Sequence, residues 1–196
     1  MNSIVSEKRF ISQTLGVPYE NLSQSYLRSE TVLTTQAAID FTLQTNKKQA
    51  ALVTERLLNL NDEFVVTHFT VGLKRIASDT PTDLQQLTAP ILTYDNSTAF
   101  AGTNGANVSS IYNSDLSWTI DRREFIPQFP MRAFRRVPTA QEAANAGYTS
   151  EPTRINGRQT IDLSVNLGSS VTFDDSSNSY YAVFEARGYL VVNAAS

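Results

Sequence analysis

The spacing of apolar residues changes from a helical to an extended period near residue 26. Before it, Ile4, Ile11 and Leu15 lie on one line of a helix predicted over residues 3–15, and the Gly-Val-Pro sequence that follows ends this helix. The apolar line is narrow. It fits a helix that lies on its own domain, which we favour, or an arm that docks on a neighbouring subunit. Residues 17–25 are predicted to be a linker.

Beyond residue 26, apolar and polar side chains alternate in several segments, the pattern of half-buried strands. Strands are predicted at residues 38–43, 63–76, 116–120, 161–167 and 180–194, and residues 171–173 either extend the run at 161–167 or pair with it. In the long segment 63–76, strict alternation places Val65 and Phe69 on one face and Phe64 and Val66 on the other. Residues 47–58 fit a short helix or a strand, and the pattern does not decide between them.

Glycine, proline and asparagine divide the remaining segments. Residues 77–90 are predicted to be a loop and residues 95–107 a surface excursion. Three prolines between residues 121 and 138 exclude a central strand and a continuous helix there. Residues 139–147 resemble one or two helical turns. The sequence therefore predicts an all-β protein, an antiparallel β-sandwich over residues 26–196 preceded by a helical arm and linker over residues 1–25.

Composition excludes several kinds of chemistry. The 196 residues include no Cys and one His, so disulfides, thiol nucleophiles, Cys-zinc sites and His-rich metal sites are excluded. The single histidine, His68, falls inside a predicted strand with no nucleophile-elbow sequence in the chain, and a half-exposed strand residue is the better interpretation. Asp174 and Asp175 lack the glycine and terminal glutamate of a calcium loop, which favours a hairpin turn. We assign no catalytic residue, metal or cofactor, and expect a protein that is not an enzyme.

The N-terminus predicts no signal peptide, because Glu7, Lys8 and Arg9 interrupt the stretch that would have to be apolar. No segment approaches the length of a membrane span. We therefore expect synthesis in the cytosol. Sequons at Asn21, Asn96 and Asn107 are attributed to chance in a chain rich in Asn and Ser.

One segment departs from the acidic composition of a chain whose net charge is -3. We call it the arginine strip. It consists of Arg122, Arg123, Arg132, Arg135 and Arg136, interleaved with Phe125, Phe129 and Phe134. Arginine and aromatic residues are enriched at protein interfaces, and the same mixture binds single-stranded nucleic acid. The acidic net charge makes nucleic acid the least favoured partner, so a protein interface is preferred over a solvated loop.

The order of elements supplies a family resemblance. A helix and linker are followed by the strand EFVVTHFTVGLKRI, the segment IDRREFIPQFPMRAFRRVP and a closing YYAVFEARGYLVVNA. This order, with strands rich in Asn, Ser and Thr, resembles a jelly-roll virion protein, such as a capsid or vertex protein of a tailless bacteriophage. The resemblance implies two facing antiparallel sheets, a symmetric homo-oligomer and contacts with other virion proteins. The chain lacks a basic N-terminal arm, which argues against genome binding.

Two other functions stay open at this point. A carbohydrate-binding or adhesive β-sandwich is the first, with an aromatic platform built from Trp118, Tyr112, Tyr180 and Tyr181. The second is a hydrolase that uses a carboxylate pair, whose geometry no spacing in the sequence reveals. The preferred hypothesis is a structural protein of the virion whose predicted interface comprises the apolar line of the helix and the arginine strip.

Overall fold

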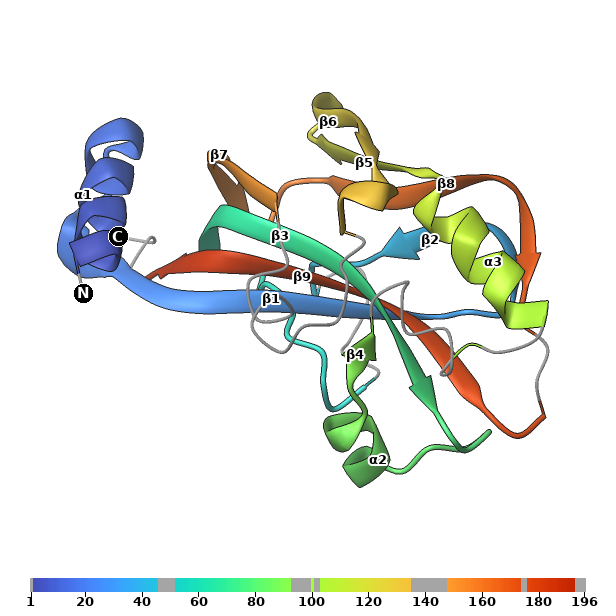
Figure 1. Cartoon of the computed structure of the whole chain (residues 1–196). Coiled ribbons are helices and arrows are strands. Elements are labelled where there is room, and N and C mark those ends of the chain that lie inside the picture. Colours follow the sequence, from blue (N-terminus) through green and yellow to red (C-terminus); the bar gives the residue numbers. More distant parts are fainter. Residues whose placement is uncertain are drawn as a thin grey trace.

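The computed structural model describes residues 2–45, 52–92, 100, 103–134, 148–173 and 176–192. Three helices and two 3₁₀ turns accompany nine strands in these residues. Figure 1 shows how the helices and strands are arranged. The helical elements are α1 (Asn2–Leu15), η1 (Tyr19–Asn21), α2 (Asp83–Thr88), α3 (Thr103–Tyr112) and η2 (Met131–Phe134). The strands are β1 (Leu22–Val32), β2 (Thr35–Phe41), β3 (Glu63–Ile76), β4 (Ile91–Leu92), β5 (Asp115–Ile120), β6 (Arg123–Pro130), β7 (Tyr148–Asn156), β8 (Ile161–Thr172) and β9 (Ser179–Val191).

The described strands form two antiparallel sheets. The first has the order β1-β9-β3-β4, with β7 also paired to β3, and the second has the order β2-β8-β5-β6. Strands near the start of the chain pair with strands near its end: β1 with β9, β2 with β8, β3 with β7, and β5 with β6. This nested pairing, divided between two sheets, is the strand order of a jelly roll. The predicted all-β sandwich with an N-terminal helix is confirmed.

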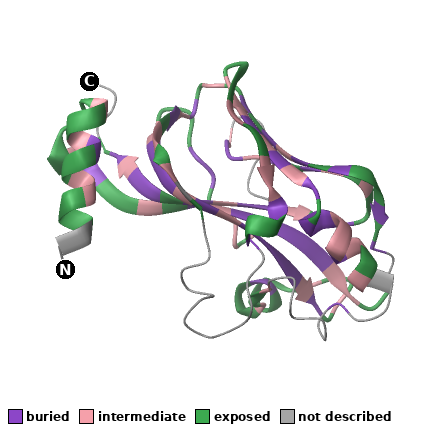
Figure 2. Ribbon diagram, turned by 45° about the horizontal axis from the view of Figure 1, so that its top comes forward, coloured by how far each residue is buried: buried purple, intermediate pink, exposed green. Residues whose placement is uncertain are grey.

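The core lies between the two sheets. Buried residues run along the inner side of both sheets in Figure 2, and Trp118 of β5 is fully buried among aromatic rings from the opposite sheet. Its indole meets Phe69 of β3 edge to face at 5.8 Å and Phe184 of β9 at 5.5 Å. Edge-to-face pairs of this kind add to the stabilisation that burial provides. The two sheets are thus joined by aromatic packing.

The predicted faces of β3 are corrected by a β-bulge. The register against β9 shifts between Val66 and His68, so Thr67 is an extra residue and the alternation changes phase. Gly188 of β9 allows this close approach, because a Cβ there would lie 1.8 Å from the carbonyl oxygen of Val65. As a result, one core receives side chains from both predicted faces. These are Phe64, Val66, Phe69, Val71 and Leu73.

Two helices lie in segments predicted to be irregular, and those predictions are wrong. Helix α2 begins inside the predicted loop 77–90, where Thr82 and Gln85 form a reciprocal capping box. Helix α3 begins inside the predicted excursion 95–107 and packs Val108, Ile111 and Tyr112 into the core. Its glycine, asparagine and serine content opposes a helix, so burial of this face is the stabilising contribution.

Other boundaries differ in detail. Strand β1 begins at Leu22, inside the segment predicted to be linker. Within 47–58, the described residues form a turn and two single bridges, Arg28 with Arg56 and Gln44 with Leu58. Strand β6 ends the described order of its sheet, as its prolines require of an edge strand. The helical turns predicted at 139–147 lie outside the described residues.

Candidate assembly surfaces

The arginine strip separates into an inner aromatic side and an outer charged side. Phe125 packs against the indole of Trp118 at 5.2 Å, and Phe129 contacts Phe134 and Tyr148 at 5.3 and 4.5 Å. Phe134 is buried, while Phe125 and Phe129 are half-buried. The phenylalanines therefore attach β6 and η2 to the core and are not a stacking surface for a ligand.

The arginines of the strip that the structure describes face solvent. Arg122, Arg123 and Arg132 are exposed, and none of them makes an ion pair with another described residue. Arg135 and Arg136 lie outside the described residues. Across 121–132, three arginines and two carboxylates leave a net charge of +1, so this part of the strip is only weakly cationic. That charge fits contacts with a protein better than neutralisation of a phosphate backbone.

The β5–β6 hairpin presents Arg122 at a fixed position. Asp121 and Arg122 have positive φ angles of 49° and 63°, the geometry of a two-residue hairpin turn that usually contains glycine or asparagine. The carboxylate of Asp121 accepts hydrogen bonds of 2.9 Å from the backbone N–H of Thr160 and the side-chain amide of Gln159. This turn is therefore held against the β7–β8 turn, and a left-handed non-glycine residue persists only where its surroundings impose it.

Helix α1 lies beyond the end of the sandwich, across the strands of the first sheet (Figure 1). Of its predicted apolar line, Ile11 is fully buried and Leu15 packs beside it, in a cluster that includes Val65 of β3 and Val191 of β9. Ile4 is exposed, because the helix extends past the sheet. Ile11 and Leu15 thus bind the helix to its own chain, as the favoured interpretation predicted, and Ile4 stays available to another molecule.

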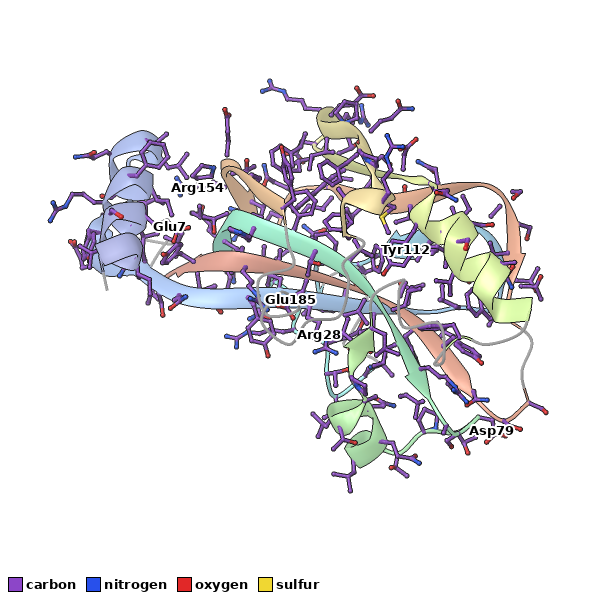
Figure 3. All side chains as sticks on the ribbon, viewed as in Figure 1. Glu7, Arg28, Asp79, Tyr112, Arg154 and Glu185 are labelled. Atoms are coloured by element: carbon purple, nitrogen blue, oxygen red, sulfur yellow. The ribbon has the colours of Figure 1, made fainter. Side chains whose placement is uncertain are left out.

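A hydrogen bond between side chains also holds α1 in place. The Tyr189 hydroxyl donates to the Glu7 carboxylate over 2.9 Å, and Figure 3 shows Glu7 on the side of the helix that faces the strands. Burial and the adjacent negative charge of Glu7 raise the pKa of Tyr189 above its ordinary value. On the same helix, the Lys8 ammonium lies 4.5 Å from the ring centre of Tyr19. The contact face of α1 is therefore polar at its edges and apolar at its centre.

A buried ion pair joins β1 to β3 on the outer side of the first sheet. Lys74 contacts the Glu30 carboxylate, and both side chains are 0% exposed. Arg28 binds the other oxygen of Glu30 at 2.7 Å, and the Lys74 ammonium lies 4.9 Å from the ring centre of Tyr181. Burial lowers the pKa of Lys74, and the hydrogen bond to Glu30 opposes that shift. Burial raises the pKa of Tyr181.

The geometry of this ion pair fits a structural role and not a catalytic one. Each oxygen of the Glu30 carboxylate already has a cationic partner, and the group has no contact with solvent. Glu55, the neighbouring carboxylate, accepts hydrogen bonds from the backbone N–H groups of Glu30 and Leu52. A carboxylate pair that hydrolyses a glycoside needs room for a substrate between its members, and these two groups offer none.

The residues considered for other functions lie in the interior or outside the described ranges. Trp118, Tyr112, Tyr180 and Tyr181 are all buried, so they form no platform for a sugar. His68 is half-exposed in β3, as predicted. Asp174 and Asp175 lie outside the described residues. In the described part of the chain, no group of three or more metal-binding side chains occurs, and no helix has the length and apolar character of a membrane span.

Sequence reasoning missed one exposed surface. Leu84 and Leu87 of α2 are 69% and 58% exposed, the two most exposed of the large apolar side chains among the described residues. The signal was present, because Thr82 and Gln85 have capping-box spacing and the two leucines are three residues apart. We call Leu84, Leu87 and the adjacent Asp83 the α2 face.

Comparison with known proteins adds no identification. Neither a protein family nor a curated protein matches the chain. Function must therefore be argued from the fold and the surfaces described above.

Proposed function

We propose that the protein is a structural, non-enzymatic component of a virion, a capsid or vertex subunit of a tailless bacteriophage, that acts by symmetric self-assembly. Its partners are then copies of itself and other virion proteins, and its location is the virion. One observation carries this proposal. A jelly-roll sandwich carries a helix, α1, that is attached at one end of the sheets and leaves Ile4, Val5 and Phe10 exposed.

The fold and the exposed side chains both support a role in protein contacts. Viral capsid domains are among the proteins built on the jelly roll, and lectins are another class. The aromatic residues that a sugar site would have used are buried. The exposed groups are instead apolar side chains on two helices and arginines on a rigid hairpin, the residue types that form interfaces between proteins.

Sedimentation velocity over a range of protein concentrations tests the proposal. We expect a discrete oligomer, and we expect the combined replacements Arg122→Ala, Arg123→Ala and Arg132→Ala to weaken it, because an arginine that anchors an interface costs about 2 kcal/mol or more when truncated. Arg187→Ala, which removes an exposed arginine from β9 in the other sheet, is the matched control. A protein that stays monomeric at all concentrations contradicts the proposed function.

The same variants distinguish a protein partner from a nucleic-acid partner. Binding of the wild-type protein to single-stranded DNA is measured by fluorescence anisotropy at several salt concentrations. Tight binding that falls steeply with salt and is lost in the triple variant would favour nucleic acid as the partner, because each phosphate contact releases a counterion. We expect no such binding.

A further inference from the structure

The exposed parts of α1 and α2 are complementary in chemistry. On α1, Val5 precedes Arg9 by four residues, so the two side chains are neighbours on one face of the helix. On α2, Asp83 precedes Leu87 by the same spacing. Val5 and Leu87 are exposed apolar groups, 46% and 58% exposed. Each face therefore combines one apolar group and one charge, with charges of opposite sign.

The order of these groups fixes how the two helices would pack. Val5 lies toward the N-terminus of α1 and Leu87 toward the C-terminus of α2. An antiparallel arrangement places Val5 on Leu87 and Arg9 on Asp83, whereas a parallel arrangement places each apolar side chain on a charge. The antiparallel arrangement also opposes the two helix dipoles, which is favourable.

One chain cannot make this contact with itself. The cluster under α1 includes Val65, near the start of β3, whereas α2 leads into β4, which pairs with β3 at Leu73 and Lys74. Nine residues of extended strand separate Val65 from Lys74, about 30 Å at roughly 3.3 Å per residue. Figure 1 shows α1 at the left end of the sandwich and α2 well apart from it, below the sheets and next to β4. A helix anchored at one end of β3 therefore meets α2 only on a different molecule.

We infer that α1 of one copy docks antiparallel on the α2 face of a second copy. This inference rests on the proposed function, since it names the contact through which copies would assemble. Two copies can make this contact twice in a two-fold dimer, or each copy can offer α1 to one neighbour and the α2 face to another, which is a heterologous contact. Contacts of this type generate rings when the rotation closes and filaments when it does not.

Complementation between two variants tests the contact. Val5→Glu disables α1 and leaves the α2 face intact, while Leu87→Glu disables the α2 face and leaves α1 intact. The two variants carry the same charge, so the two disabled faces repel each other. Each variant alone is expected to need at least about tenfold more protein to assemble than the wild type, because a charge would have to be buried against an apolar group. An equimolar mixture is expected to form a one-to-one dimer that does not grow, since only one productive contact is left.

A charge exchange provides a second measurement that does not depend on apolar packing. Arg9→Asp alone and Asp83→Arg alone are each expected to weaken assembly by up to about fivefold, the range of an exposed ion pair. The two changes together in one chain are expected to restore it, because every contact then pairs Asp at position 9 with Arg at position 83. Recovery in the doubly changed chain requires these two positions to meet.

Control variants keep the outcomes distinct. Leu60→Glu places the same charge on an exposed apolar residue outside both faces and is expected to assemble as the wild type does. All variants are compared by circular dichroism and thermal unfolding to confirm folding. If the wild type assembles and both single variants assemble equally well, or if the mixture forms no dimer, the inference is overturned while the proposed function stands. A wild type that never assembles overturns both.

Discussion

Replacing one member of the Glu30–Lys74 pair is expected to reveal how much of the sandwich depends on it. In the variant Glu30→Gln, Lys74 stays buried with the ring of Tyr181 and no carboxylate in contact. Breaking a buried pair typically costs about 3–5 kcal/mol of the free energy of unfolding. The cost of burying an unpaired Lys74 charge has an upper bound, because the buried ammonium can lose its proton and become neutral. For a lysine with an ordinary pKa near 10.4, losing the proton at pH 7 costs about 4.6 kcal/mol.

The reverse replacement is expected to cost less. Lys74→Met leaves Glu30 with Arg28, whose guanidinium donates to the same carboxylate at 2.8 Å, so we expect about 3 kcal/mol. Arg28 has a partly exposed side chain and can meet water when Glu30 is replaced, which is why Lys74 dominates the cost in Glu30→Gln. The double variant Glu30→Leu with Lys74→Met is expected to approach or exceed wild-type stability, because it removes both charges.

Urea denaturation at several pH values measures these effects. In Glu30→Gln the folded state loses the proton of Lys74 while the unfolded state keeps it, so stability is expected to rise with pH by up to about 1.4 kcal/mol per unit until the unfolded lysine titrates near pH 10. The wild type is expected to show this rise only at higher pH, since Glu30 holds the proton on Lys74. If Glu30→Gln and Lys74→Met each lower the free energy of unfolding by less than about 1 kcal/mol, the pair is hydrated and the reasoning is wrong. The same conclusion follows if the stability of Glu30→Gln does not change with pH.

Three further predictions concern the bulge and helix α1. Gly188→Ala is expected to cost about 3 kcal/mol or more in urea denaturation, because its Cβ would overlap the carbonyl of Val65, whereas Gly168→Asn, at an open left-handed position, is expected to cost much less. Tyr189→Phe is expected to cost about 1–2 kcal/mol at pH 8 through the lost bond to Glu7. The raised pKa of Tyr189 makes wild-type stability fall as the pH rises above about 10, where only the unfolded phenol ionises, so this variant should show a smaller fall. Deletion of residues 1–16 is expected to leave a circular-dichroism spectrum typical of β-structure and to prevent assembly. It is expected to lower the free energy of unfolding by about 3 kcal/mol, because the buried side chains of Ile11 and Leu15 are lost. An unchanged oligomer would contradict a role for α1.

The sequence predicted strands well where residues of β-forming type alternate without proline. Strand β3 begins and ends at the predicted residues, and β5 begins one residue earlier than predicted. Strand β8 begins at the predicted Ile161 and continues to Thr172, so the segment 171–173 extends this run and does not form a separate partner strand. The faces of β3 were predicted wrongly because a bulge depends on the partner strand. Nothing between residues 63 and 76 shows that Gly188 will lie opposite Val66. Period alone therefore gives the strand but not its phase.

The two missed helices had opposite causes. Helix α2 carried a capping box that was readable in the sequence, but its six residues fell between two prolines and were assigned to a loop. Helix α3 has a composition that disfavours helix, and its burial decides its structure. Missing α2 also hid the α2 face, so the predicted interface included α1 without a surface for it to contact. The arginine strip was predicted as one surface. In the structure its phenylalanines pack against the core, and only its described arginines face solvent.

The position of β9 has a consequence for synthesis on the ribosome. Strand β9, the last of the described strands, is an inner strand of its sheet, with β1 on one side and β3 on the other. A nascent chain that ends before Ser179 has therefore made both neighbours without the strand that joins them. At roughly 5–20 residues per second, these edges stay unpaired for seconds while the second half of the protein is translated. This sheet is therefore completed only after β9 has left the ribosome, and we expect a chain stalled before Ser179 to be sensitive to protease throughout β1 and β3.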